Sequence, residues 1–424
     1  MKLVEINSTK FKSLADKHEQ ITFHQTKEWG KLKEKNGWHS YFLSLEEKGK
    51  SYGCTLMLTK DVPIIKKRIC YCPRGFLIDY KNEEILKTFT EEIKEFASKK
   101  KAIFIKIDPY VPYKQHDREG ALVEGGFDNS EVVKNLKNLG YKHFGFNLMQ
   151  DALQPRWMHT ITLKKRTLEE VMQDMESKTR QILRKNERSA ITTREITREE
   201  LPKFKHIMQH TSDRREFVDR PLSYYENMWD NLEKSGILKI LVAEIDFDEY
   251  KKNTEKEKDE IKKENNILKM NEKKFNSKQK QDEERIKQLE KQLTEIESYQ
   301  YKYGHKALLG GILFLIYGNE VLSLYGGSLK ELMHFQSAYT LHFAGIKYAY
   351  DHHFDTYNFY GITGDFRKEN PLLGLYLFKK SFGGQVVELV GEFDLIISSF
   401  WYKAYNGAFK IYHGIKNIKK KQGK

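Results

Sequence analysis

Two adjacent lysines close an apolar run in the stretch GLYLFKKSFGG (374–384), directly before a pair of glycines. An inward-facing ammonium group, on Lys379 or Lys380, would be placed to hold a negative charge. The alternative is an ordinary helix end, in which the lysines complement the helix dipole and Gly383 supplies the C-terminal cap. The residues alone leave both interpretations open.

The common catalytic motifs are missing from this sequence. It has no phosphate-binding loop of the form G-x-x-x-x-G-K-[ST], no G-x-G-x-x-G after a strand, no G-x-S-x-G elbow and no H-E-x-x-H pair. It also lacks the [RQ]-x-x-G-x-[GA] loop whose amides bind the pyrophosphate of acetyl-coenzyme A. Either the chain is not an acyltransferase, or its acyl donor is not coenzyme A.

The cysteines and the apolar runs bear on the cellular compartment. Cys54, Cys70 and Cys72 fit neither a disulfide framework nor a zinc pattern, so we expect a reducing cytosol and no metal site. The N-terminal residues lack the apolar core of a signal peptide, and no run approaches the roughly 18–20 apolar residues of a membrane-spanning helix. We therefore expect a soluble, cytoplasmic protein that at most touches a membrane from outside.

Positive charge dominates the composition. Lysine and arginine number 74 against 60 acidic residues, a formal charge of +14. This excess favours a polyanionic partner: nucleic acid, a phosphorylated small molecule or an anionic membrane face. The basic stretch SKTRQILRKNERSA (177–190) is suited to phosphates or simply to solvent, and the tail KIYHGIKNIKKKQGK (410–424) is suited to weak contact with an anionic bilayer.

The elements that must position such groups alternate between strands and helices, which predicts an α+β (mixed α/β) fold. A weak internal duplication is visible. In each copy two strands and a glycine (Gly75 or Gly327) precede a helix, a further strand and a helix that ends at a glycine. A cleft between the copies would be the default binding site. The expected strands include AIFIKI (102–107), ILKILVAEI (237–245), GILFLIY (311–317), EVLSLY (320–325) and TYNFYGI (356–362).

Residues 248–303 differ from the rest, because they are rich in Lys, Glu and Gln and contain neither Pro nor Gly. Apolar residues recur there at the spacing of a coiled-coil seam. The polar stretch NSKQKQDE (276–283) separates two such halves, so we expect an antiparallel helical hairpin, with a disordered linker as the alternative. The seam positions are Ile261, Leu268 and Phe275 before the polar stretch, and Ile286, Leu289, Leu293 and Ile296 after it.

A series of short motifs runs along the whole chain. They are EWGKLKEKNGW (28–38), RGFLIDY (74–80), IKIDPYVPY (105–113), LQPRWMHTITL (153–163), FVDRPLSYYENM (217–228), LYGGS (324–328), YNFYGITGDF (357–366), YLFKKSFGG (376–384) and ELVGEFD (388–394). In this order they resemble the Fem peptidyltransferases, the FemA/FemB/FemX and MurM/MurN group of low-GC Gram-positive bacteria. Any single motif is weak, but the full set in family order is specific.

The resemblance implies two acetyltransferase-like (GNAT) domains with an inserted antiparallel coiled-coil arm. We expect the first domain in residues 1–152 and 388–424, the second in 153–247 and 304–387, and the arm in 248–303. It also implies an aminoacyltransferase that moves an amino acid from aminoacyl-tRNA to the stem-peptide amine, or an existing branch, of a peptidoglycan precursor. That donor agrees with the missing coenzyme A motif, so no cofactor is expected. The alternatives are a non-catalytic tRNA- or precursor-binding protein of the same fold, such as an immunity factor, and an acetyl-CoA acyltransferase.

Carried over residue by residue, the resemblance places Lys33, Arg220, Tyr224 and Tyr325 around the diphosphate of lipid II or of the uridine-diphosphate-linked muramyl pentapeptide. Arginine suits a bidentate phosphate grip, while lysine acts as a point charge. Trp38 would wall this pocket. Without the resemblance, Lys33 would be interpreted as a solvated charge and Arg220 as a residue that orders a loop. Tyr325 and Trp38 would be interpreted as packing residues.

The resemblance gives Lys379, beside Phe378, the role of stabilising the oxyanion that forms when the amine attacks the tRNA-borne ester, an effect on the order of a few kcal/mol. An ester is already activated, so proximity and charge stabilisation suffice without a covalent nucleophile. Lys380 would then be a solvated cap. Asp108 would orient the amine or accept its proton, with a turn-forming Asp-Pro as the alternative. Glu392 would pair with a lysine across the cleft or form a structural salt bridge.

The basic helix would hold tRNA through Lys178, Arg180, Arg184, Lys185 and Arg188. The arm is similar to that of FemA-like members and would contact tRNA, with homo- or heterodimer contact as the competing role. A tyrosine that lines the acceptor pocket in short members aligns near Ile103, so the acceptor would differ in detail. Glycine, serine and alanine all stay open as the transferred amino acid, as do the bridge position and whether a lipid or a nucleotide carries the acceptor.

Overall fold

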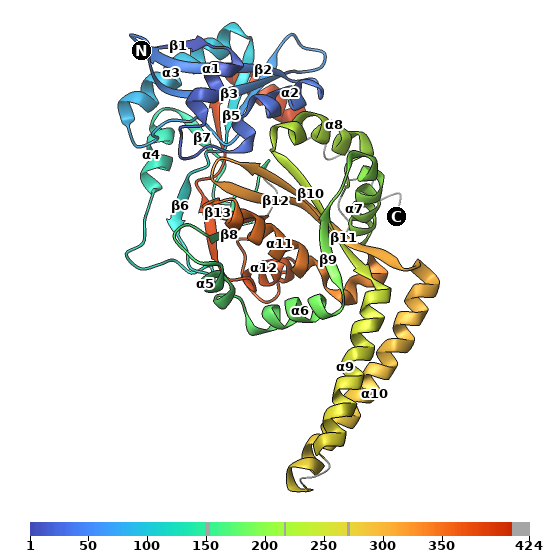
Figure 1. Ribbon diagram of the computed structural model, residues 1–424. Coiled ribbons are helices and arrows are strands. Elements are labelled where there is room, and N and C mark those ends of the chain that lie inside the picture. The colour runs from blue at the N-terminus through green and yellow to red at the C-terminus, as the bar shows by residue number, and fades with distance from the viewer. Residues whose placement is uncertain (149–152, 216–217, 269–271, 409–424) are drawn as a thin grey trace.

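The computed structural model describes residues 1–148, 153–215, 218–268 and 272–408, apart from the side chains of 266–268 and 272–277. The chain forms two mixed α/β units, and a pair of long helices projects from the second unit (Figure 1). The basic tail (410–424) lies outside the described residues. Within the described part, no helix is both long and apolar enough to cross a membrane.

The first sheet is built mainly from N-terminal residues, but a C-terminal strand completes it. Helix α3 (Glu83–Lys99) buries Leu86, Phe89 and Ile93 against one face, and α1 (Ser8–Ala15) and α2 (Lys27–Glu34) cover the other. A further helix, α4 (Ser130–Asn138), precedes the edge strand β7. In spatial order the described strands are β1 (Lys2–Glu5), β2 (His39–Glu47), β3 (Lys50–Asp61), β4 (Arg68–Cys72), β5 (Ala102–Ile107), β15 (Phe393–Ile396) and β7 (Tyr141–His143).

The second sheet carries more helices. Helices α7 (Leu201–Arg215) and α8 (Leu222–Leu232) cover the face toward the first unit, and α11 (Ser337–Asp351) covers the opposite face. In spatial order the described strands are β6 (Pro112–Gln115), β14 (Gln385–Leu389), β8 (Trp157–Thr162), β13 (Thr356–Gly361), β12 (Glu320–Ser328), β11 (Lys306–Tyr317), β10 (Leu238–Asp246) and β9 (Ile191–Glu195). The remaining elements are α5 (Leu168–Gln173), α6 (Ser177–Arg188), α12 (Leu373–Lys380), η1 (Phe23–Gln25), η2 (Arg198–Glu200), η3 (Glu233–Ser235) and η4 (Lys330–Phe335).

The same pattern of pairing recurs in the two sheets. β4 and β5 are parallel and joined by α3, and β12 and β13 are parallel and joined by α11. In both sheets the strands before this pair are antiparallel. A parallel pair needs a crossover connection, which a helix supplies. The expected strands are confirmed, and the repeated topology agrees with the duplication seen in the sequence.

The two units share one apolar core. Phe11, Trp29 and Leu56 of the first unit belong to the same buried cluster as Phe204 and Tyr225 of the second, and α2 packs directly against α8. Strand β6, which we expected in the first domain, pairs with β14 in the second sheet. The chain therefore crosses between the sheets more often than our two-part division of the sequence implied.

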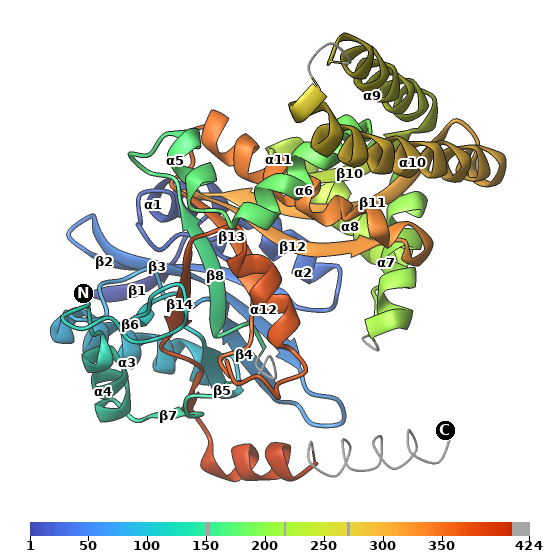
Figure 2. The same cartoon turned by 90° about the horizontal axis from the view of Figure 1, so that it is seen from below.

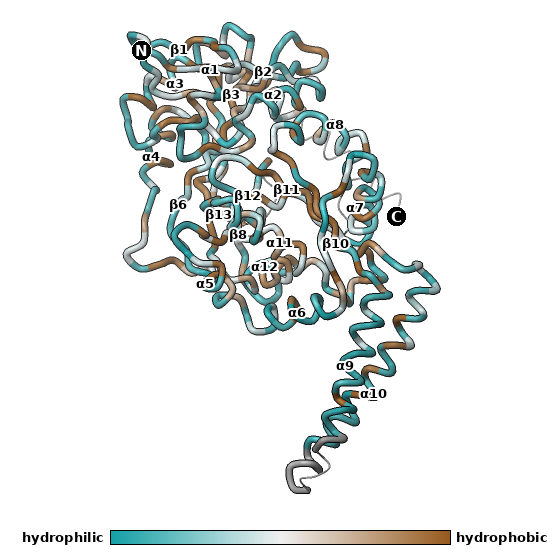
Figure 3. The backbone as a smooth tube through the Cα atoms, viewed as in Figure 1, coloured by the Kyte–Doolittle hydropathy of each residue, from teal (hydrophilic) through white to brown (hydrophobic). Residues whose placement is uncertain are grey.

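The projecting helices are α9 (Phe247–Leu268) and α10 (Glu272–Tyr303). Leu289 and Ile296 are buried in their seam, and the arm is otherwise mostly hydrophilic (Figure 3). Its surface carries inter-helix ion pairs such as Arg285–Glu257 at 2.7 Å. The predicted antiparallel hairpin is confirmed, but our separator 276–283 is wrong: it is helical within α10, because nothing in that polar stretch breaks a helix. The side chains of Leu268 and Phe275 lie outside the described residues.

Candidate functional site

Side chains from four distant segments gather where α2 meets α8. They form a set that we call the basic–aromatic cluster, and every residue that we predicted to hold a diphosphate belongs to it. The sequence analysis missed one member, Lys60, whose ammonium group lies 5.5 Å from the centre of the Trp38 ring. The members are Lys33, Trp38, Lys60, Arg220, Tyr224 and Tyr325.

Lys33 is a half-buried cation that faces other cations. Helix α2 begins at Thr26, whose hydroxyl accepts the amide of Trp29 at 3.1 Å, and Lys33 lies one turn further on, 4.3 Å above the Trp29 ring. Burial, with added repulsion from Arg220 and Lys60, lowers the pKa of Lys33 to about 8. No carboxylate forms an ion pair with Lys33 among the described residues. An anion bound here would relieve both the burial cost and the repulsion.

Arg220 and the two tyrosines complete the cluster. The Arg220 guanidinium lies 5.4 Å from the Tyr224 ring, and the hydroxyls of Tyr224 and Tyr325 are 3.4 Å apart. The adjacent carboxylate, Asp219, already accepts the Tyr225 hydroxyl at 2.7 Å and pairs with a lysine of α7. Burial raises the pKa of Tyr224, so its hydroxyl stays a neutral donor. The cluster therefore offers two cations and two hydroxyls to an anion.

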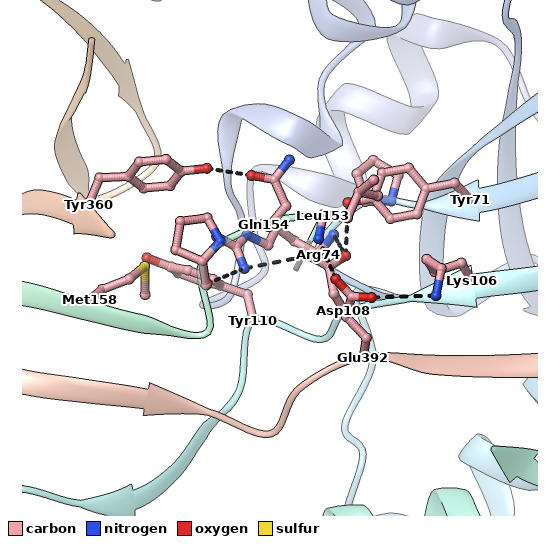
Figure 4. Close-up of polar contacts among 12 residues, drawn as sticks. Tyr71, Arg74, Lys106, Asp108, Tyr110, Leu153, Gln154, Met158, Tyr360 and Glu392 are labelled. Atoms are coloured by element: carbon pink, nitrogen blue, oxygen red, sulfur yellow. Dashed lines mark hydrogen bonds and ion pairs between the residues drawn. The ribbon is translucent and has the colours of Figure 1, made fainter. Parts of the chain in front are cut away.

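A second polar group lies between the two units (Figure 4). Asp108, at the end of β5, is buried and accepts the Tyr71 hydroxyl at 3.0 Å and the Arg74 amide at 2.8 Å. The Arg74 guanidinium lies 3.5 Å from Asp108 and donates to the Pro155 carbonyl at 3.3 Å. Burial raises the pKa of Asp108 to about 6, although Arg74 opposes the shift. A cavity of about 10 Å³, near the room that one water needs, separates this group from Glu392.

Asp108 and Glu392 therefore have defined partners. Asp108 fixes Arg74, which has φ +59° and precedes Gly75 at φ +81°. A Cβ at position 75 would come within 2.8 Å of Pro109, so only glycine fits this turn. Glu392 accepts the Leu153 amide at 2.6 Å and pairs with Lys106 at 3.4 Å. Lys106 lies on β5 of the same sheet, so the expected lysine across the cleft is wrong and the salt bridge is local.

Lys379 faces inward and is 7% exposed. Its side-chain nitrogen donates to the carbonyls of Phe359 and Gly361, both at 2.7 Å. Burial lowers its pKa to about 7. Lys380, expected in solvent, instead forms an ion pair with Glu119. Of the two interpretations of GLYLFKKSFGG, the inward-facing lysine is confirmed; its role in stabilising an oxyanion stays a prediction.

The two carbonyls held by Lys379 flank Tyr360, which has φ +65° at an irregular point of β13. A non-glycine residue rarely adopts this conformation, which costs roughly 1–2 kcal/mol. The Tyr360 hydroxyl donates to Gln154 (Figure 4). Interactions with Arg74 and Tyr325 both affect its pKa, which burial raises. Tyr360 thus stands between the basic–aromatic cluster and the Arg74–Asp108 pair.

Behind Tyr360 lies a buried carboxyl group that the sequence did not reveal. Glu320 accepts the Tyr110 hydroxyl at 2.9 Å and the Asn358 amide at 3.0 Å, and burial raises its pKa. Arg74, Gln154 and Tyr360 were likewise missed, although each lies in a motif quoted above. The motifs marked the segments, but the left-handed backbone at Arg74 and Tyr360 has no signal in the residue types.

The basic helix α6 presents most of the predicted tRNA-binding residues to solvent. Arg180 is an exception, because its guanidinium donates to the Gln173 carbonyl at 3.0 Å and to two neighbouring carbonyls at the end of α5. It caps that helix rather than standing free. Exposed positions without an ion pair among the described residues are Lys178, Arg184, Lys185 and Arg188.

Two further expectations can be placed. Ile103, aligned with a pocket tyrosine, is fully buried under Phe104 and Tyr402, away from the cluster. Phe378 packs edge-on against Tyr339 at a ring distance of 4.9 Å, which makes it part of the wall around Lys379. Within the part of the chain described here, no group of three His, Cys, Asp or Glu side chains is placed to hold a metal ion.

Fold and site together define a two-unit α+β protein with an anion-seeking cluster beside a buried inter-unit polar group. Residues 6–410 match the sequence model of the FemAB family, so the chain belongs to that family. It is 29% identical over 419 residues to aminoacyltransferase FemA of Staphylococcus aureus strain bovine RF122 / ET3-1, covering 97% of this chain and 99% of that protein. The FemA of strain MRSA252 matches to the same extent.

A crystal structure of FemX superposes with a TM-score of 0.79 at 28% identity, covering 95% of this chain and 99% of that one. With the two mixed sheets described above, this match confirms the predicted α+β fold of two acetyltransferase-like units with an inserted helical arm.

Proposed function

We infer that this chain is an aminoacyltransferase that builds the interpeptide bridge of peptidoglycan. The observation that carries this conclusion is the match to FemA over 97% of the chain and 99% of the relative, in a family that covers residues 6–410. The donor in our proposal is aminoacyl-tRNA and the acceptor is the amine of a stem peptide or of an existing branch. The enzyme works in the cytoplasm, next to the inner face of the plasma membrane.

The basic–aromatic cluster binds the diphosphate of the precursor in this proposal. Lys33 and Arg220 lie close enough to repel each other, and no ion pair to a carboxylate offsets Lys33 among the described residues. A diphosphate would restore the charge balance, with hydroxyl hydrogen bonds from Tyr224 and Tyr325. The unpaired cations of α6 bind the tRNA backbone, whose charge density suits such a surface.

Chemistry then requires the acceptor amine to attack the ester carbonyl. A carbon–nitrogen bond forms, the carbonyl oxygen becomes an oxyanion, and the carbon–oxygen bond to the tRNA ribose breaks as the amine proton leaves. We assign Lys379 two tasks in this step. It holds the β13 backbone that aims Tyr360 between the units, and as an ammonium ion it keeps one N–H beyond its two carbonyl bonds for the oxyanion.

Purified protein, a mixture of charged tRNAs and lipid II test the function directly. The expected result is a precursor whose mass has risen by one or more amino-acid residues, and that mass identifies the amino acid. A parallel reaction with the nucleotide-linked pentapeptide distinguishes the two acceptors. Precursor binding without any mass increase would instead favour the non-catalytic binding protein.

A further inference from the structure

The turn between β3 and β4 carries an apolar side chain that the fold leaves uncovered. Ile64 is fully exposed, at 105% of its reference area, and its backbone has φ +75°. A β-branched residue is strongly disfavoured in that conformation, and a full-length aliphatic side chain in water gains nothing from packing. Two local rules are thus broken at one residue, as happens at functional sites.

Cations surround this tip. A concavity of about 460 Å³ lies beside it, lined by five basic side chains and a single carboxylate. That carboxylate, Asp61, already pairs with Arg68 at 2.7 Å. Lys100 keeps its ammonium group 4.3 Å above the Tyr41 ring, at the edge of the concavity. The lining residues are Asp61, Ile65, Lys66, Arg68, Lys99, Lys100 and Lys101.

A second apolar projection stands next to the first. The helix formed by residues 399–408 packs on the hairpin, because Trp401 joins Val62 and Ile65 in one apolar cluster. Phe400 of this helix is 72% exposed. Figure 2 shows the helix lying along the same end of the molecule as β4 and β5. Ile64 and Phe400 therefore project from adjoining elements with lysines around them.

We propose that this hairpin-tip surface, formed by Ile64, Phe400 and the basic concavity, docks the enzyme onto an anionic phospholipid bilayer. Exposed apolar side chains inside a ring of lysines suit an interface where the apolar groups enter the acyl boundary and the cations meet phosphates. RNA would use the cations but gives an aliphatic isoleucine no partner, since single strands are held by aromatic stacking and charge.

The docking surface adjoins the candidate precursor site. Lys60, near the end of β3, belongs to the basic–aromatic cluster and precedes the hairpin turn by one residue. Docking at Ile64 would hold that cluster close to the headgroups. This consequence rests on the proposed function, and it selects a lipid-carried acceptor over a nucleotide-carried one.

Vesicle co-sedimentation with the full-length protein tests the docking itself, without any transfer reaction. Wild-type protein should sediment with phosphatidylcholine–phosphatidylglycerol vesicles and stay in solution with phosphatidylcholine alone. Ile64→Ser should weaken binding about tenfold or more. The double variant Lys66→Gln/Lys101→Gln should weaken it about 25-fold at low salt. Tyr301→Ser on the arm, equally exposed at 96%, is the matched control and should bind like wild type.

Wild-type-like binding by Ile64→Ser, or no binding of the wild type to anionic vesicles, would overturn the proposal. So would an unchanged vesicle affinity in the lysine variant combined with a loss of binding to uncharged tRNA, which would assign the surface to RNA. Unfolding midpoints of both variants should equal that of the wild type, because the altered side chains are exposed. A failure of aminoacyl transfer with intact vesicle binding would refute the proposed function and leave the docking surface standing.

Discussion

Replacing Lys379 by methionine removes the two hydrogen bonds that hold β13 around Tyr360. Methionine is close to lysine in length and fills the same space, but it cannot donate to the carbonyls of Phe359 and Gly361. Each buried carbonyl left without a partner costs roughly 1–3 kcal/mol. The left-handed backbone at Tyr360 then has less to hold it in place.

The lower bound of that cost, about 2 kcal/mol for the pair, corresponds to about a 30-fold slower transfer if it falls entirely on the reaction barrier. Removal of an oxyanion donor would add on the order of 100-fold. We therefore expect Lys379→Met to lower the rate constant for transfer by at least about 30-fold while precursor affinity survives, because the basic–aromatic cluster lies on other elements. Lys380→Met, which removes only a surface ion pair, is the matched control and should stay within about twofold.

Single-turnover transfer across a pH series separates the two tasks of Lys379. A neutral amine still has two N–H groups, enough for both carbonyls, but it has no charge for an oxyanion. If the cation takes part, the transfer rate of the wild type should fall as pH rises through about 7, the pKa of Lys379. If the residue only positions β13, that titration should leave the rate unchanged. A wild-type rate in Lys379→Met would refute both tasks.

The other predictions concern separate parts of the molecule. Arg220→Met should weaken precursor binding about tenfold or more in calorimetry, and equal affinity of this variant and the control Arg215→Met would rule out the phosphate role. The Asp108 carboxyl has a pKa of about 6 in the fold against 3.8 when unfolded, so the folded state binds more protons between these values and stability should fall as pH rises from about 4 to 6; Asp108→Asn should remove that slope in chemical denaturation. Neutralising the exposed cations of α6 should reduce the salt dependence of tRNA binding by roughly 0.7–0.9 for each phosphate that no longer meets a cation, whereas Arg180→Met should chiefly lower the unfolding midpoint. The four positions to neutralise are Lys178, Arg184, Lys185 and Arg188.

Residue patterns predicted much of the fold because the signals were local. AIFIKI (102–107) is a strand since its apolar run is short, β-branched and followed by Asp-Pro. The arm followed from seven-residue spacing in a stretch without Pro or Gly. The position of its turn did not follow, because in a stretch of uniformly good helix formers no residue marks where one helix ends.

The sequence by itself determined that the chain has mixed sheets, a helical arm, an excess of cations and the motifs of one family. These properties depend on near neighbours and on composition, so they can be read along the chain. Only the tertiary structure decided that Lys379 bonds two carbonyls, that Asp108 is enclosed by Tyr71 and Arg74, and that Lys60 joins Lys33 and Arg220. Each of those facts depends on which distant backbone atoms lie within about 3–6 Å of a side chain and on how far burial excludes water, and both are set by the packing of the two sheets against one another.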